Sequence, residues 1–159
     1  MTHPLEIRLA TAADRDTIAD FNIRLAEESE GKRLDPDVLR EGVAALLRDT
    51  TKGRYFVAIR EGRIIGQLMH TWEWSDWRNG QIWWLQSVYV VPEHRRQGVF
   101  RALFNHALAE AEADPGVVGV RLYVEEQNTP AHDVYRSLGL REGGYFVMQR
   151  MFRRDPESC

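Results

Sequence analysis

One glycine and three arginines come together where a predicted strand gives way to a helix, in the segment Pro92-Glu93-His94-Arg95-Arg96-Gln97-Gly98-Val99-Phe100-Arg101. Ser, Thr, Asp and Asn, the residues that best cap a helix, are absent just before this helix. Its first N–H groups and its dipole therefore favour an anion. Gly98 has no Cβ to obstruct a close approach. The pattern predicts either a cradle for a pyrophosphate or a basic, solvated loop before a water-capped helix.

The same segment matches a family motif. Residues Val88–Leu103 resemble the acetyl-CoA motif of GCN5-related N-acetyltransferases (GNAT), Arg/Gln-x-x-Gly-x-Gly/Ala at the start of a helix. Arg95 and Gly98 match that motif, whereas Phe100 departs from its final small residue. A backbone N–H serves equally well at that position, so the departure concerns packing around the phosphate.

A second stretch, Asn128–Leu140, resembles the later motif of the same family: an Asn, a helix carrying Ala131 and Tyr135, and then Gly139 before a large apolar residue. The order of predicted elements resembles the family over essentially the whole chain. The resemblance implies a V-shaped gap between two parallel strands, Gln81–Val91 and Val118–Glu125, that holds acetyl-CoA.

The resemblance also implies roles for single residues. Main-chain groups of Val88, Tyr89 and Val90 would pair with pantetheine as an added strand does, and a backbone N–H near Val88 would bind the oxyanion. Tyr135 would protonate the leaving thiolate, although its helical spacing fits a core aromatic equally well. The remaining cofactor contacts implied are Arg95, Arg96, Gln97, Gly98, Val99, Phe100, Arg101 and Asn128.

The predicted function is therefore an acetyl-CoA-dependent N-acetyltransferase acting on a primary amine of a small molecule. The amine is mostly protonated at neutral pH, so a base or a chain of waters must take its proton. The strand positions where relatives carry a carboxylate are Gln86 and Ser87, which are poor bases. Glu73 is our first choice, with Asp76, Glu125 and a water relay through Gln86 as alternatives.

Other readings stay open. A protein or peptide N-acetyltransferase is the second enzyme candidate, and it would need an open groove. A sensory module that binds acyl-CoA without catalysis is the candidate from a different class, since no carboxylate stands at Gln86 or Ser87. No metal is needed by this chemistry, and His70, His94, His106 and His132 show no metal-type clustering.

All five tryptophans fall in one short stretch, at Trp72, Trp74, Trp77, Trp83 and Trp84. Trp72 and Trp74 share a face of their strand, so they are candidates for an aromatic wall of the acceptor site, together with Asp76 and Gln86. Trp83 and Trp84 point to opposite faces. Packing in the core and the turn explains any single tryptophan as well. Glu27, Glu28 and Glu30 are either a solvated helix end or a surface that steers a cation.

These residues need a mixed α/β sheet to position them. Alternation and turn residues predict about six strands, at Leu5–Leu9, Arg54–Arg60, Arg63–Thr71, Gln81–Val91, Val118–Val124 and Tyr145–Phe152. About four helices are predicted, starting near Thr11/Asp14 (capping-box spacing), Asp35-Pro36, Val99 and Thr129-Pro130. Strands flanking the Val99 helix should be parallel, joined by a right-handed crossover.

The chain of 159 residues is expected to form one domain, 1–159, of globular composition, with 43% apolar and 28% charged residues. Its formal charge of −3 argues against nucleic-acid binding, which usually needs a basic domain. We find no apolar run long enough for a bilayer and no signal peptide, which predicts a cytoplasmic protein without a membrane partner. The single cysteine, Cys159, excludes an internal disulfide. Exposed strand edges are compatible with a homodimer, for which the sequence gives no specific signal.

Overall fold

A five-stranded mixed sheet forms the centre of the protein in the computed structural model, which describes residues 3–153. The strands follow one another across the sheet in chain order, antiparallel except for the last pair. They are β1 (Glu6–Leu9), β2 (Arg54–Arg60), β3 (Arg63–Ser75), β4 (Gly80–Val90) and β5 (Val117–Leu122).

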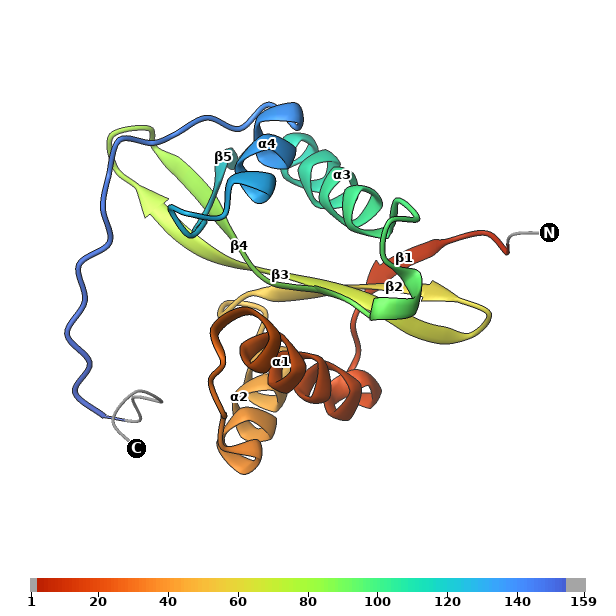
Figure 1. The fold of residues 1–159 in the computed structure, drawn as a ribbon. Coiled ribbons are helices and arrows are strands. Elements are labelled where there is room, and N and C mark those ends of the chain that lie inside the picture. The colour runs from red at the N-terminus through yellow and green to blue at the C-terminus, as the bar shows by residue number, and fades with distance from the viewer. Residues whose placement is uncertain (1–2, 154–159) are drawn as a thin grey trace.

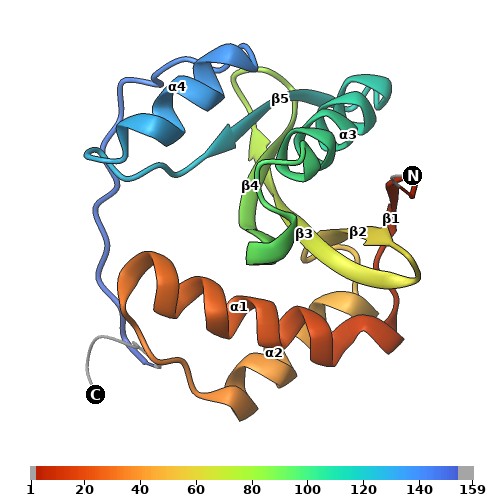
Figure 2. The ribbon, with the colours of Figure 1, turned by 45° about the vertical axis from the view of Figure 1, so that its right-hand side comes forward.

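Helices cover both faces of this sheet. Figures 1 and 2 show α1 (Arg15–Glu30) and α2 (Pro36–Arg48) on one face, and α3 (Val99–Ala113) and α4 (Thr129–Ser137) on the other. Two short 3₁₀ turns, Ala12–Asp14 and Pro92–His94, precede α1 and α3. Within residues 3–153, no helix combines the length and the apolar character that crossing a bilayer requires.

Three of the four predicted helix starts carry a capping contact. The Asp35 carboxylate accepts hydrogen bonds from the backbone N–H groups of Asp37 and Val38, at 2.9 and 3.3 Å. The backbone N–H of Thr11 donates to the Asp14 carboxylate at 2.8 Å. Asn128 caps α4 by accepting from the Ala131 N–H. Each contact satisfies N–H groups that a helix end otherwise leaves free.

Strand β4 changes character along its length, and this change positions the site. From Gln81 to Leu85 it pairs with β3 on one side and with β5, in parallel, on the other. Beyond Leu85 the pairing with β5 ends, whereas the pairing with β3 continues to Val90. The predicted parallel crossover and the splay between the two parallel strands are confirmed.

The predicted sixth strand, Tyr145–Phe152, is wrong. Residues 141–153 carry no strand, and the chain leaves α4 as an extended segment drawn clear of the sheet (Figure 1). The apolar content of this segment favours a strand, but a strand also needs a neighbour for its backbone groups. No described strand pairs with it. The sheet therefore has five strands instead of about six.

Candidate active site

A cavity of about 600 Å³ opens where β4 and β5 part. It lies between the C-terminal end of α1, the end of β4, and the start of α3. Of the cofactor residues predicted from sequence, all but Gln97 and Asn128 line it. The lining residues are Leu25, Glu28, Ser29, Val88, Tyr89, Val90, His94, Arg95, Arg96, Gly98, Val99, Phe100, Arg101 and Val134.

A bulge in β4 forms one wall of the cavity. Gln67 of β3 faces Tyr89 and Met69 faces Gln86, so Ser87 and Val88 together oppose the single residue between them on β3. Ser87 adopts a left-handed backbone conformation, with φ of 49°. A bulge of this kind bends its strand and increases its twist. It lies at the point where β4 loses its pairing with β5.

A buried network of amides holds this bulge. The Gln67 Nε2 donates to the Ser87 carbonyl oxygen at 3.2 Å and to the Asn22 Oδ1 at 2.9 Å. The Asn22 Nδ2 in turn donates to the Tyr55 hydroxyl at 3.0 Å. Gln67 is fully buried, and Asn22 and Tyr55 are nearly so. Because a buried polar group without its partner is costly, this network connects α1 and β2 to the shape of β4.

The loop before α3 lines the cavity with Arg95, Arg96 and Gly98. Arg96 and Gly98 both adopt left-handed conformations, with φ of 60° and 79°. No side chain among the described residues caps the start of α3. Successive N–H groups in such a turn form a concave site for an anion, and the helix dipole adds to it. A Cβ at Gly98 would meet nothing within 4 Å, so the space beside it is open.

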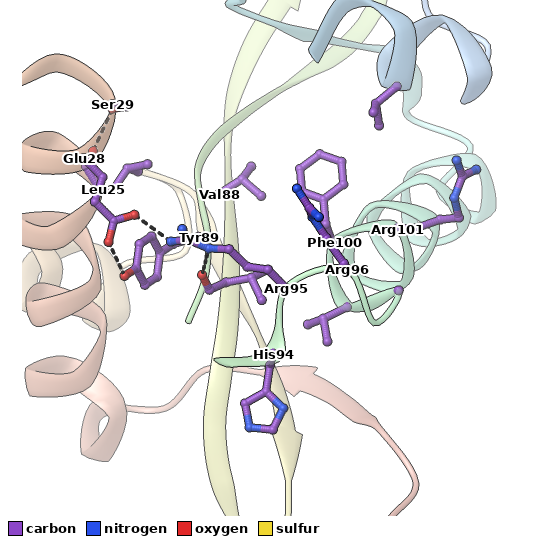
Figure 3. A pocket seen from close by; sticks show the side chains of 14 residues that line it. Leu25, Glu28, Ser29, Val88, Tyr89, His94, Arg95, Arg96, Phe100 and Arg101 are labelled. Carbon is purple, nitrogen blue, oxygen red and sulfur yellow. Dashed lines mark hydrogen bonds and ion pairs between the residues drawn. The ribbon is translucent and has the colours of Figure 1, made fainter. Parts of the chain in front are cut away.

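Arg95 lies in the cavity wall, but its guanidinium is already engaged (Figure 3). Its Nε donates to the Val90 carbonyl oxygen at 2.8 Å, and its Nη2 pairs with the Glu28 Oε2 at 2.6 Å. The Tyr89 hydroxyl donates to the other Glu28 oxygen at 3.0 Å, and the Arg95 guanidinium lies 5.4 Å from the centre of the Tyr89 ring. Arg95 thus fastens the loop to β4 and α1.

The hydrogen bond from Arg95 lowers the pKa of Glu28, with a further contribution from Tyr89. Burial, followed by the hydrogen bond to Glu28, raises the pKa of Tyr89. Glu28 therefore remains a carboxylate and Tyr89 a neutral phenol at neutral pH. A carboxylate held in this way is a poor general base, but it contributes a fixed negative charge to the α1 side of the cavity.

Tyr135, Asn128 and Gln97, the other residues predicted for the cofactor side, do not line the cavity. Tyr135 packs its ring against Phe104 and Phe100, with centroids 5.5 and 6.1 Å apart. Burial raises the pKa of Tyr135, so its hydroxyl keeps its proton at neutral pH. Asn128 caps α4, as described above. Gln97 accepts from Arg60 at 2.8 Å and donates to the Glu93 carbonyl oxygen.

Glu73, the first choice for the base, is not brought to the cavity. Its carboxylate pairs with the Arg121 guanidinium at 2.7 Å, across the paired end of the sheet. Its register partner on β4 is Ile82, and Val88 lies about 20 Å farther along that strand. Asp76, in the turn after β3, accepts from the Trp77 N–H and also does not line the cavity. Of these candidates Gln86 lies nearest to Val88 in the chain, and its Nε2 donates to the Thr71 hydroxyl at 2.7 Å.

The tryptophans divide between the two faces of the sheet. Trp72 packs its ring against Trp83, with centroids 5.6 Å apart, in the core beneath α3, and donates to the Thr50 carbonyl oxygen. Trp74 shares the face of Trp72 and is 58% exposed. Neither residue lines the cavity. Trp84 points to the opposite face, where its ring stacks on Tyr123 at 4.4 Å.

The resemblance implied that the first two helices help to wall the acceptor site, but sequence reasoning did not assign the individual residues of the α1 wall. Leu25, Glu28 and Ser29 come from the end of α1, and Val134 comes from α4. The run of glutamates at 27, 28 and 30 was the available signal, and a solvated helix end explained it equally well. Only the tertiary packing of α1 on β4 distinguishes Glu28 from its two neighbours.

Comparison with known proteins gives one consistent result. Residues 19–140 match the model of the "Acetyltransferase (GNAT) family". The chain is 31% identical to a phosphinothricin N-acetyltransferase from Streptomyces viridochromogenes over 150 residues, which is 89% of this chain and 80% of that protein. It is 29% identical to an aminoalkylphosphonate N-acetyltransferase from Salmonella typhimurium, over 87% of this chain and 83% of that one.

A solved structure is also similar to this chain. It is the crystal structure of a possible acetyltransferase from Clostridium difficile 630, with 48% sequence identity and a TM-score of 0.89. The match covers 94% of this chain and 98% of that chain. Both the sequence and the fold are therefore similar over nearly the whole length.

Proposed function

We propose that this chain, which belongs to the acetyltransferase (GNAT) family, transfers the acetyl group of acetyl-CoA to a primary amine of a small molecule. One observation carries the proposal: a single cavity joins the unpaired end of β4 to the uncapped, left-handed turn that starts α3. The first wall offers backbone groups to an extended amide chain, and the second offers N–H groups to a pyrophosphate.

The residues present fit this co-substrate. The backbone of Arg96 through Arg101 would hold the pyrophosphate, with the charges of Arg96 and Arg101 beside it. The main chain of Val88, Tyr89 and Val90 would pair with the pantetheine amides. The guanidinium of Arg95 is left out of direct phosphate binding in this proposal, because Glu28 and Val90 already occupy it.

The reaction needs three contributions: stabilisation of the oxyanion, a proton for the leaving thiolate, and removal of a proton from the amine. A neutral amine attacks the thioester carbon, a C–N bond forms, and the C–S bond breaks to release the CoA thiolate. A backbone N–H near Val88 would stabilise the oxyanion. Tyr135, neutral because its pKa is raised, would supply the proton that the thiolate takes.

The amine must lose a proton before or during attack. Glu73 is paired with Arg121 and distant from Val88 along the sheet, which argues against direct proton transfer to it. The alternative with most support is a water relay beside Gln86 and Thr71, whose side chains lie on the α1–α2 face next to the bulge. In this relay the amine releases its protons to solvent, and Tyr135 regains from solvent the proton that it gave to the thiolate.

The small-molecule acceptor is supported by the relatives and by the cavity. The two relatives described above are named for phosphinothricin and for an aminoalkylphosphonate. In this proposal the acceptor binds beside α1, whose Glu28 contributes a carboxylate to a cavity also lined by Arg95, Arg96 and Arg101. An acceptor carrying both an amine and an anionic group suits this mixture of charges.

The test is turnover with acetyl-CoA and a panel of amines, followed by release of free thiol. The panel contains amino acids, aminoalkylphosphonates and polyamines in one arm, and peptides with a free N-terminus or lysine in the other. Turnover confined to the first arm supports the proposal, whereas turnover confined to peptides replaces its acceptor class. Acetyl-CoA binding without turnover on any amine would contradict it.

A further inference from the structure

The peptide group between Ser87 and Val88 connects a buried network to the cavity. Its carbonyl oxygen, on Ser87, accepts a hydrogen bond from the Gln67 Nε2 at 3.2 Å. Its N–H belongs to Val88, which lines the cavity. This peptide is trans, so its C=O and N–H groups lie in one plane and point in opposite directions. A side chain that holds the Ser87 carbonyl therefore also sets the direction of the Val88 N–H.

The direction set in this way suits a ligand in the cavity. Gln67 lies on β3, and its second acceptor, the Asn22 Oδ1 at 2.9 Å, lies on α1. Because the Ser87 carbonyl is directed at Gln67, the Val88 N–H points away from β3 and α1. Beyond Leu85 the pairing of β4 with β5 has ended, and the cavity opens there. The N–H is thus left on the side of β4 from which β5 has parted.

The backbone at this point needs support, because Ser87 is left-handed, with φ of 49°. Such a conformation is unfavourable for a residue with a Cβ, and it persists only where the surrounding contacts enforce it. The contact from Gln67 to the Ser87 carbonyl is one that enforces it, and Asn22 in turn fixes the Gln67 amide. Backbone strain of this kind gathers at functional sites.

Gln67 also costs the protein stability, which points to a role beyond packing. A carbonyl oxygen can only accept, so the Nε2 of Gln67 must face Ser87. The Gln67 Oε1 is then buried without a hydrogen-bond partner among residues 3–153. A buried oxygen without a partner is destabilising, and an apolar side chain at this fully buried position would avoid that cost. Residues that break a rule of stable packing are expected at functional sites.

We propose that Gln67 is a positioning residue for acetyl transfer: by holding the Ser87 carbonyl, it aims the Val88 N–H at the carbonyl oxygen of the thioester. This assignment rests on the proposed function, in which that N–H stabilises the oxyanion. The hydrogen bond from Gln67 also polarises the peptide, because linked hydrogen bonds strengthen one another. Both effects act on the charge that develops during attack, so they belong to kcat and not to the KM for acetyl-CoA.

The first experiment compares steady-state kinetics and melting temperatures of two variants. Gln67→Met keeps the length of the side chain and removes its amide, so kcat should fall by roughly tenfold while the KM for acetyl-CoA stays nearly constant. Tyr55→Phe is the matched control, because it breaks the far end of the same network, at Asn22, and leaves the Ser87 carbonyl bonded. It should lower the melting temperature and keep kcat. Equal losses of kcat in the two variants would assign Gln67 to stability alone and overturn the proposal.

A second experiment reads the hydrogen bond to the thioester directly and needs no acceptor amine. Infrared difference spectra, recorded with acetyl-CoA isotopically labelled at the thioester carbonyl, report the C=O stretch of the bound molecule. An N–H that donates to this oxygen lowers the frequency. The lowering is expected in the parent and in Tyr55→Phe, and it should be largely lost in Gln67→Met.

The outcomes separate this assignment from the proposed function. A lowered frequency that persists in full in Gln67→Met overturns the role of Gln67 and leaves acetyl transfer untouched. An unshifted frequency in the parent overturns the Val88 donor and, with it, the role of Gln67. Failure of acetyl transfer itself shows separately, as acetyl-CoA binding without thiol release on any amine.

Discussion

The two ends of β4 differ in what they offer to a ligand. Its paired end, Gln81–Leu85, has strands on both sides, and its side chains lie in an aromatic core or on a sheet face that carries an ion pair. Its open end, from Gln86 to Val90, has lost β5, and Val88, Tyr89 and Val90 line the cavity. We therefore propose that this strand provides stability at one end and a binding edge at the other. The expectation is that changes around the open end affect turnover, whereas changes at the paired end affect folding.

The largest effect is expected from Tyr135→Phe, beside the open end. Phenylalanine keeps the packing against Phe100 and Phe104 but removes the proton donor. If Tyr135 is the acid, kcat falls by roughly 100-fold while the KM for acetyl-CoA stays nearly constant. Steady-state thiol release measures both. An unchanged kcat would remove Tyr135 from the mechanism, and a lower melting temperature would assign it to packing.

The second-largest effect is expected at the paired end, where His70 of β3 is fully buried between aromatic rings. Its ring stacks on Trp83 at 3.6 Å, and neither ring nitrogen makes a hydrogen bond of good geometry within residues 3–153. Burial lowers the pKa of His70 to about 4; a weaker contact with the Thr71 backbone opposes this, and the nearby Arg54 charge adds to it. The folded protein therefore binds this proton less readily than the unfolded chain does.

The contribution of neutral His70 to the free energy of unfolding is therefore fully present above the unfolded pKa of about 6.5. It is lost as the pH falls toward 4. Between about pH 7 and about pH 5 the free energy of unfolding should drop by about 2 kcal/mol on this account. Urea titrations at the two pH values measure the drop. In His70→Phe this part should vanish, whereas His3→Gln, at an exposed histidine, should keep it. Equal drops in all three proteins would contradict the assignment.

The next effect is expected from Gly98, which lies before α3 and lines the same cavity as the open end of β4. Its φ of 79° costs an alanine about 1–2 kcal/mol, and the added Cβ would project into the open space beside the α3 start. Gly98→Ala should raise the KM for acetyl-CoA by about tenfold with a smaller change in kcat. Gly42→Ala is the matched control, because Gly42 lies within α2 with nothing near its Cβ. A KM that stays constant in Gly98→Ala would mean that no phosphate approaches this turn.

The sequence predicted the open end better than the paired end, and the reason is physical. The loop and the α3 start are contiguous in the chain, and their chemistry lies in backbone groups that a glycine and the absence of a cap residue reveal. By contrast, which face Trp72 or Glu73 occupies depends on strand register and helix packing, and Arg121 and Thr50 come from distant segments. The role of Glu28 depended in the same way on how α1 packs against Tyr89.

The predicted sixth strand failed for a related reason. The apolar residues between Tyr145 and Phe152 are typical of a strand. A strand also needs a partner strand, however, which local sequence cannot specify. Within residues 3–153 these eight residues have no strand partner and no backbone hydrogen bond to another segment.

The smallest effect is expected from Glu73→Gln, and it bears most directly on the comparison. The Glu73 side chain is 40% exposed and the Arg121 side chain 34%, so solvent screens their ion pair. It therefore contributes less than about 1 kcal/mol to folding. If the base is a water relay beside Gln86, kcat and its pH profile stay within about twofold of the parent, because Glu73 lies about 20 Å along the sheet from Val88. Arg121→Gln should show the same small loss of stability, and the double variant little more.

A loss of kcat in Glu73→Gln with Arg121→Gln unaffected would instead make Glu73 the base. The paired end of β4 would then take part in catalysis, and the division of labour along the strand would not hold.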